Sequence, residues 1–252
     1  MAEQAAESLE GWYCLHLFWK MDWSRWRKLT DPERESLLQD FRLRLEEFAG
    51  LDRQGQGCHY LFKVIGQKAD LGLMVLRQDL GELADLTDEL GKLPLFDYFD
   101  DVLSFLSVTE VGLYGGKPQS ERAWAHVDAA LHPAVPTEPY ICFYPMSKLR
   151  LPDANWYTLP YEQRQAYMKD HGLIGRSYAG RVSIILTGAI GLDDHEWGVS
   201  LFAQDPLEFK KIVTEMRYIE ASSIYGDFPY FLVGQHLDTD ALGALLLEGL
   251  AS

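Results

Sequence analysis

Cysteines and basic residues are scarce in this sequence. The 252 residues include three cysteines, Cys14, Cys58 and Cys142, and because this is an odd number with no CxxC pair, neither a disulfide framework nor a zinc site is expected. Long apolar runs are also missing, and the run at residues 12–19 is far too short to cross a membrane. The opening MAEQAAESLEG is acidic where a signal peptide is basic. We therefore expect a protein of the reducing cytoplasm that does not insert stably into a membrane.

The charge balance is strongly acidic. With 23 Lys and Arg against 38 Asp and Glu, the formal net charge is -15. Such a surface repels polyanions, which argues against a nucleic-acid partner and against an anionic membrane surface. An anionic ligand would need the few cations gathered at one place. With 47% hydrophobic and 24% charged residues, the composition is that of a folded protein with one large domain or two smaller ones.

The two halves of the sequence follow a common plan. Residues 70–79, DLGLMVLRQD, resemble residues 196–205, EWGVSLFAQD, and the matching Gly, Gln and Asp residues lie half the chain apart. Residues 12–18 and 140–146 correspond in the same way, and a proline at the start of a helical pattern follows each. Apolar spacing then predicts strand, helix, strand, strand, helix, strand in each half.

These patterns place the predicted elements and the domain boundaries. In the first half we predict strands at about 11–19, 58–66, 70–77 and 101–113, and helices at about 31–49 and 79–92. In the second half we predict strands at about 139–145, 181–188, 196–203 and 219–236, the last broken at Gly226, and helices at about 160–170 and 205–217, with Asp205 as N-cap. The stretch 114–138 reads as an irregular connection. The fold expected is α+β: tandem ferredoxin-like repeats forming an α+β barrel, with halves at 1–118 and 139–252 and a linker at 119–138.

The most distinctive residues lie between positions 144 and 180. Tyr144-Pro-Met-Ser-Lys-Leu-Arg150 is followed by Met168-Lys-Asp-His171-Gly-Leu-Ile-Gly-Arg-Ser-Tyr-Ala-Gly180. Together with Gly191-Leu-Asp-Asp, Glu196-Trp-Gly, Glu215-Met-Arg and Tyr225-Gly, these motifs resemble the coproheme decarboxylases of Gram-positive bacteria, in the chlorite dismutase-like superfamily. The resemblance covers most of the chain and is strongest over 139–230. It implies that residues 139–252 bind an iron porphyrin.

The resemblance also implies roles for single residues. Tyr144 would form the catalytic radical, Lys148 would act beside it, and His171 would be the proximal ligand of the iron. The residues expected at the porphyrin are Tyr144, Pro145, Met146, Ser147, Lys148, His171, Ile184, Arg217 and Ser222.

The three central residues have simpler interpretations as well. His171 precedes Gly172, a helix stop signal, so it is also a histidine placed at the negative end of a helix dipole. As an iron ligand it needs an acceptor for its second ring nitrogen, for which Glu220 is a weak candidate. Tyr144 precedes a proline and is either a core tyrosine in extended backbone or an oxidisable phenol. Lys148 is either a solvated loop residue or the partner of a propionate.

A four-carboxylate substrate requires cations in so acidic a protein. Of the arginines near these motifs we favour Arg217, because its Glu-Met-Arg context matches the family; the others are Arg150, Arg176 and Arg181. We interpret the neighbouring aromatic residues as core packing and one further histidine as a surface residue: Trp156, Tyr157, Trp197 and His195.

Two positions depart from the family pattern. Ile184 stands where the decarboxylases carry a distal glutamine and chlorite dismutases an arginine, which argues against chlorite chemistry and leaves the orientation of peroxide open. Ala130 stands where the family often has an arginine for a propionate, and nearby His132 is a candidate substitute.

The resulting hypothesis is an oxidoreductase, a coproheme decarboxylase. It would use hydrogen peroxide to decarboxylate two propionates of Fe-coproporphyrin III (coproheme) and give haem b, so that the substrate is its own redox cofactor. The alternatives are a haem peroxidase or chlorite dismutase-like enzyme, a non-catalytic haem-binding or carrier protein, which has no need of Tyr144 and Lys148 together, and a purely structural barrel. By analogy with the family we also expect a homo-oligomer, a pentamer, with ferrochelatase as the upstream source of substrate.

Overall fold

The computed structural model describes residues 5–249, which form two compact units. Unit 1 comprises residues 5–11 and 107–233, and unit 2 comprises residues 12–106 and 234–249. Both units combine helices with antiparallel strands, as the α+β prediction requires. The last described residues join unit 2, so the compact units do not follow the predicted division of the sequence. The tandem repeat and the packing of two sheets as a barrel stay predictions.

The elements of unit 2 follow the order predicted for the first half. They are β1 (Ser8–Met21), whose first residues belong to unit 1, α1 (Trp23–Trp26), α2 (Asp31–Arg53), β2 (Gly57–Val64), β3 (Leu71–Arg77), α3 (Leu80–Gly91), η1 (Pro94–Tyr98), β4 (Phe99–Gly112), which continues into unit 1, and α8 (Thr239–Leu247). Antiparallel pairing gives the strand order β11-β2-β3-β1.

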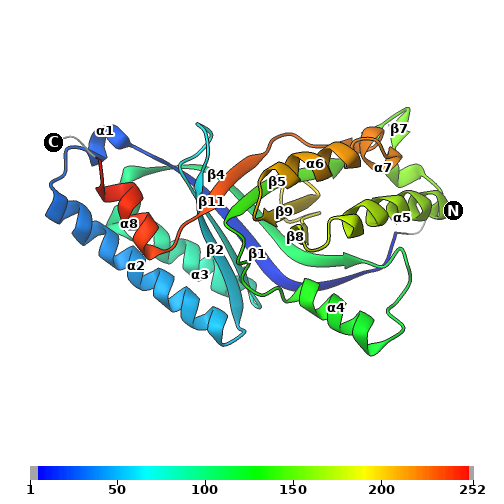
Figure 1. The fold of residues 1–252 in the computed structure, drawn as a ribbon, viewed down its shortest axis with the longest axis horizontal. Coiled ribbons are helices and arrows are strands. Elements are labelled where there is room, and N and C mark those ends of the chain that lie inside the picture. Colours follow the sequence, from blue (N-terminus) through cyan, green and yellow to red (C-terminus); the bar gives the residue numbers. More distant parts are fainter. Residues whose placement is uncertain (1–4, 250–252) are drawn as a thin grey trace. The chain divides into compact units, whose positions relative to one another are not determined.

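Helix α2 lies along the strands of unit 2 (Figure 1), and its side chains supply much of the core of that unit. It begins with a capping box in which the side chains of Thr30 and Glu33 satisfy each other's backbone N–H groups. Four apolar residues at helical spacing then lie in one buried cluster with leucines of β2, β3 and α3: Leu38, Phe41, Leu45 and Phe48. Burying such side chains contributes about 1.5–3 kcal/mol each, so α2 is held mainly by packing.

Unit 1 contains the second predicted group of elements. They are α4 (Glu121–Leu131), β5 (Tyr140–Lys148), β6 (Arg150–Leu151), β7 (Ala154–Asn155), η2 (Trp156–Thr158), α5 (Tyr161–Ser177), β8 (Val182–Gly188), β9 (Trp197–Ala203), α6 (Leu207–Met216), α7 (Glu220–Ser223), β10 (Gly226–Asp227) and β11 (Leu232–His236), the last ending in unit 2. The strand order is β10-β5-β9-β8-β4, all antiparallel.

Three local predictions were wrong. The linker is not irregular throughout, because α4 forms within it behind the N-cap Ser120. The region 219–236 opens with the short helix α7 and not with a strand. Helix α5 does not stop at Gly172 but continues to Ser177. Glycine costs a helix only about 1 kcal/mol, and packing of Ile174 and Tyr178 in a buried cluster beyond it offsets that cost.

One face of the unit 1 sheet carries the side chains relevant to function. Paired residues of antiparallel strands point to the same face, and the register aligns Tyr144 of β5 with Val199 of β9, and Val199 with Leu186 of β8. Several residues of this face pack with α5 and α6, among them Val199 and Tyr144. Among residues 5–249, no helix combines the length and the apolarity that crossing a membrane requires.

Candidate functional site

Tyr144 lies near the middle of β5 in an aromatic surrounding. Its ring centroid is 4.7 Å from that of Phe231 and 6.0 Å from that of Phe228. Burial raises the pKa of the Tyr144 phenol, the Cys142 thiol adds to this, and the Arg217 guanidinium opposes it. The phenol therefore keeps its O–H at neutral pH, which a hydrogen-atom donor requires.

The neighbours of Tyr144 on β5 divide between the two faces of the sheet. Met146 lies on the face of Tyr144, opposite Trp197, whereas the alternation of the strand turns Pro145 and Ser147 to the other face. Pro145 is buried and pairs with Gly198. A ligand on the Tyr144 face would therefore meet Pro145 and Ser147 through their backbone.

Lys148 ends β5 and is buried, in contrast to the solvated alternative. Its ammonium group donates a hydrogen bond of 2.5 Å to the backbone oxygen of Ala221 and lies 4.2 Å from the ring centroid of Trp156. Burial lowers the pKa of Lys148 to about 8, and the carboxylate of Glu196 opposes that shift. At pH 7 the side chain is still largely a cation, held close to an aromatic wall.

His171 lies inside α5, between two apolar clusters. Tyr167, one turn before it, belongs to a cluster around Trp156, and Ile174, one turn after it, belongs to the cluster of the sheet face. Because α5 continues to Ser177, the interpretation as a histidine at a helix end was wrong. Moreover, its pKa is not raised, as a helix C-terminus would raise it, but lowered.

The electrostatics of His171 suit a metal ligand. Burial, and secondly the charge of Lys148, lower its pKa to about 4, so the imidazole is neutral at pH 7 and offers a lone pair. Its Nδ1 atom is buried and has no hydrogen-bond partner among the described residues, so the structure does not join that atom to Glu220. A buried polar atom without a partner is costly, and such groups mark functional sites.

Helix α5 leaves apolar side chains of the sheet uncovered. Of its 17 residues only Arg164 is buried. On the sheet, Ile184 is 44% and Leu186 38% exposed, and Leu173 of α5 is 52% exposed. Ile184 and Leu186 lie on the face that carries Tyr144, because they align through β9 with Cys142 and Tyr144. This part of unit 1 thus has an apolar surface available for a flat ligand.

Of the arginines near the motifs, Arg217 lies close to the aromatic residues around Tyr144, whereas Arg150 and Arg181 interact with glutamates. The guanidinium carbon of Arg217 lies 4.0 Å from the ring centroid of Phe228, which packs against Tyr144. Arg150 is 3.7 Å from Glu196 and largely exposed. Arg181 donates a 2.6 Å hydrogen bond to Glu208 of α6.

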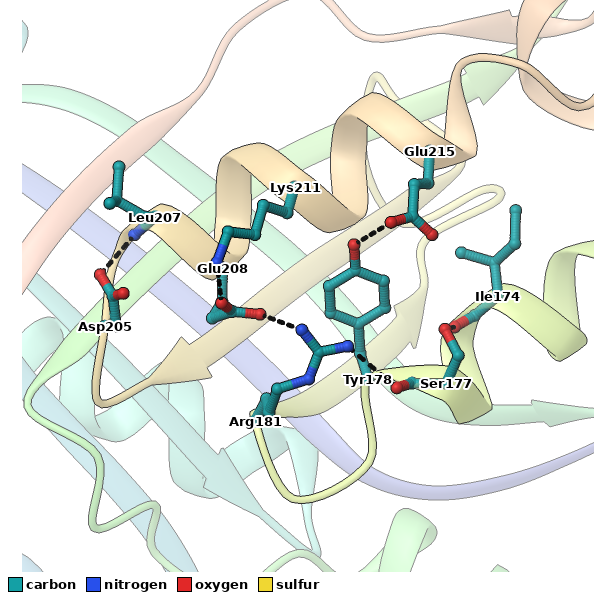
Figure 2. A network of polar contacts seen from close by, with 9 residues as sticks. All are labelled: Ile174, Ser177, Tyr178, Arg181, Asp205, Leu207, Glu208, Lys211 and Glu215. Atoms are coloured by element: carbon teal, nitrogen blue, oxygen red, sulfur yellow. Dashed lines mark hydrogen bonds and ion pairs between the residues drawn. The ribbon is translucent and has the colours of Figure 1, made fainter.

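Figure 2 shows how the end of α5 is attached to α6. Beside the Arg181–Glu208 pair, Lys211 donates to Glu208 at 2.5 Å and the phenol of Tyr178 donates to Glu215 at 2.6 Å. These contacts bridge from the α5 C-terminus to the helix behind it. They fix the C-terminal end of the helix that carries His171.

The remaining predicted residues lie at the margin of this site. Ser222 is buried in α7, next to the Ala221 carbonyl that accepts from Lys148. His195 is half-buried, with its Nδ1 3.5 Å from Ser147 Oγ. Ala130 belongs to α4, where His132 is paired with Asp128 at 2.9 Å.

Two cavities of unit 1 and unit 2 lie elsewhere. One of about 310 Å³ is lined by residues of the α4–β5 connection and one of about 500 Å³ by residues of α2 and α3. None of the predicted site residues lines either. Within the described chain, no group of three or more His, Cys, Asp or Glu side chains is arranged to hold a metal ion. A single neutral histidine would nevertheless be enough to hold a porphyrin-bound iron, because the macrocycle would supply the remaining nitrogen ligands.

Comparison with known proteins defines the class. A model of the chlorite dismutase family matches residues 34–237, so the chain belongs to this family. It is 46% identical over 241 residues to the coproheme decarboxylase of Staphylococcus carnosus (strain TM300), with 95% of this chain and 97% of that protein covered.

Solved structures agree with this assignment. One described as a novel heme-binding protein from Thermus thermophilus is 41% identical, with 98% of each chain covered and a TM-score of 0.92. A mutant chlorite dismutase from Candidatus Nitrospira defluvii, 18% identical, has a TM-score of 0.73 with 96% of each chain covered, and therefore shares the fold. The predicted chlorite dismutase-like α+β fold is confirmed.

Several residues of the site have no signal in the sequence. Phe228 and Phe231 meet Tyr144 only after the chain returns from α7, and the acceptor of Lys148 is a backbone oxygen, that of Ala221. Trp156 was interpreted as core packing, and it is buried, but it also forms the wall beside Lys148. Glu196 stands in one of the motifs quoted from the sequence, but nothing in that motif indicates its contact with Lys148.

Proposed function

We propose that the protein is a coproheme decarboxylase that acts on an iron porphyrin bound between α5 and the Tyr144 face of the unit 1 sheet. The observation that carries the proposal is that α5 holds a neutral His171, whose buried Nδ1 has no hydrogen-bond partner among residues 5–249, while Ile184 and Leu186 of the unit 1 sheet stay exposed. Identity of 46% to a coproheme decarboxylase supports the same activity.

The residues present fit such a group. His171 would hold the iron through its imidazole, while Ile184, Leu186 and Met146 would meet the flat apolar ring. Arg217 supplies a cation near Tyr144, and Lys148 supplies another at the end of the same strand, so both could meet carboxylate side chains of the porphyrin. Arg181 is already paired with Glu208 and is not needed there.

The chemistry divides between the bound porphyrin and the chain. When bound, the iron porphyrin supplies the redox centre at which hydrogen peroxide is reduced. The Tyr144 phenol gives up its O–H hydrogen atom and regains one from the propionate carbon next to the ring, while the Lys148 ammonium orients the carboxylate. Each propionate, with one hydrogen peroxide and one proton, becomes a vinyl group, carbon dioxide and two waters. Two such rounds convert Fe-coproporphyrin III into haem b.

The proposal extends to the surroundings of the enzyme. We infer a place in the cytoplasm, a homopentamer by analogy with the family, and a ferrochelatase as the source of substrate. Ile184 carries no charge to hold an anionic oxidant, which favours peroxide over chlorite. Rapid oxygen evolution from chlorite would favour the chlorite dismutase-like alternative.

The deciding experiment separates binding from chemistry. Tyr144→Phe removes the O–H but keeps the ring between Phe228 and Phe231, so coproheme binding should be nearly normal while haem b formation falls about a hundredfold or more, as for loss of a positioned catalytic proton donor. Tyr140→Phe, on the same strand, is the matched control. Mass analysis of the porphyrin after peroxide titration gives the readout. Equal rates in Tyr144→Phe and wild type would move the radical role to another residue; a carrier would leave all propionates intact in both.

A further inference from the structure

Glu196 holds the end of β5, the segment that carries Tyr144 and Lys148. Its carboxylate is buried, with 7% of the residue exposed, and its Oε2 accepts a 2.6 Å hydrogen bond from the backbone N–H of Lys148. The ladder between β5 and β9 ends at the pair of Met146 and Trp197. The Glu196 side chain therefore satisfies a backbone donor for which the β9 ladder has no partner.

The backbone of Glu196 binds the same segment in the opposite sense. Its N–H donates to the carbonyl oxygen of Met146 at 3.0 Å and lies 3.3 Å from the hydroxyl oxygen of Ser147. One residue thus contacts three consecutive positions of β5, two through its N–H and one through its carboxylate. Such bridging fixes the strand at the point where it leaves the sheet.

The charge of Glu196 faces the cations of this segment. Arg150 lies 3.7 Å from its Oε1 atom but is largely exposed, so this pair contributes little. The carboxylate opposes the loss of charge that burial imposes on Lys148. Burial first, and then the hydrogen bond to Glu196, raise the pKa of Tyr157, whose phenol therefore keeps its proton as a donor.

We propose that Glu196 is the positioning residue of the site: it fixes the Lys148 backbone and supports the Lys148 charge, so that Lys148 and Tyr144 meet the same substrate carboxylate. This inference rests on the proposed function. A merely structural carboxylate at a strand end would stabilise the fold without affecting affinity for an anionic porphyrin. The two cases can be separated by experiment.

Two substitutions separate the effect of the hydrogen bond to the Lys148 backbone from the effect of the Glu196 charge. E196Q keeps an acceptor for the Lys148 N–H but removes the charge, and E196A removes both. The matched controls are E208Q and E208A, because Glu208 is equally buried, at 7% exposed, and pairs with Arg181 and Lys211 away from Lys148. Amide hydrogen exchange of Lys148 in the ligand-free protein, the dissociation constant for ferric coproheme, and thermal unfolding are measured for all five proteins.

In E196A, the Lys148 amide should exchange about tenfold faster and coproheme should bind about tenfold more weakly, the size expected for loss of a hydrogen bond to a charged group. E196Q should keep the slow exchange yet still bind coproheme more weakly than wild type. E208Q and E208A should lower thermal stability and change neither quantity.

Unchanged coproheme binding in both Glu196 variants would overturn the proposal. If E196A does not fold, E196Q decides, and a wild-type dissociation constant in that variant counts against the role of the charge. If wild type itself does not bind coproheme, the proposed function fails. In that case the Lys148 exchange rate still tests whether Glu196 fixes the strand.

Discussion

Helices α2 and α5 each follow the first strand of one predicted half, and they differ in how many side chains they bury. Helix α2 buries four apolar side chains on the sheet of unit 2, whereas α5 buries only Arg164. The strands differ accordingly, because every residue of β3 is buried while β8 exposes Ile184 and Leu186. One unit therefore completes its core with its own residues. Unit 1 leaves apolar surface uncovered and also carries His171, the predicted iron ligand. We therefore place the porphyrin in unit 1.

The largest difference between the two helices is expected in the free energy of unfolding after a side chain is truncated. Phe41→Ala in α2 removes a fully buried ring and should cost about 3–5 kcal/mol of the free energy of unfolding. Leu173→Ala in α5, at a position 52% exposed, should change it by no more than about 0.5 kcal/mol. Urea denaturation of the ligand-free variants measures both. Comparable losses would contradict the contrast between α2 and α5.

Acid should act on unit 2 through His16. This histidine is fully buried on β1, and burial lowers its pKa to about 3. Because the unfolded state then binds the proton more readily between pH 6.5 and 3, stability should fall as the pH drops through this window. The expected loss between pH 6.5 and pH 4 is about 3 kcal/mol from this residue.

The measurement is the free energy of unfolding at several pH values. His16→Asn should show a shallower pH dependence than wild type, because the shifted group is gone. His126→Asn, at an exposed position of α4, is the control substitution. A slope unaffected by His16→Asn would show that other groups cause the acid sensitivity.

Ligand should stabilise α5 and leave α2 unchanged. At a free coproheme concentration of about 100 times the dissociation constant, binding to the folded state alone adds about 2.7 kcal/mol. Amide exchange over residues 161–177 should slow on addition of coproheme, while residues 31–53 keep their rates. Equal protection of both helices would mean that the ligand acts on the whole molecule and not on the uncovered face.

The smallest effect is expected in the network of Figure 2. Arg181→Ala removes the ion pair to Glu208, but the Arg181 side chain is about half exposed, so the loss should be about 1 kcal/mol or less. Coproheme affinity should stay at the wild-type value, because this pair lies at the α6 side of α5. Thermal unfolding and a coproheme titration test the two statements. A large drop in affinity would place Arg181 in the binding site.

Much of the fold could be predicted from local sequence. Apolar periodicity and turn residues set β1 to β5, β8 and β9 within a few residues, because that signal is local, whereas the two-residue strands β6 and β7 were not predicted. Helix α5 was predicted too short, since Gly172 is a stop signal only where no later contact holds the helix, and Ile174 provides that contact. The short helices α4 and α7 lie in segments with prolines or weak patterns, where tertiary packing decides.

The residues of the candidate site also differ in whether the sequence singles them out. Tyr144, Lys148 and His171 carry a motif and could be singled out from sequence, and their roles stay predictions. The groups around them could not, because Phe231, the Ala221 carbonyl and Trp156 reach the site through chain returns that no local pattern encodes. Glu196 is intermediate, since its motif was visible but its bond to Lys148 was not.

The glycines within α5 bear on how firmly the helix around His171 is wound. Gly172 and Gly175 lie in the last two turns, and a methyl group at either position would meet nothing closer than 3.5 Å, so packing does not demand glycine there. Each glycine makes the helix easier to unwind by about 1 kcal/mol relative to alanine. The turn next to His171 therefore resists unwinding less than it would with alanine at these two positions.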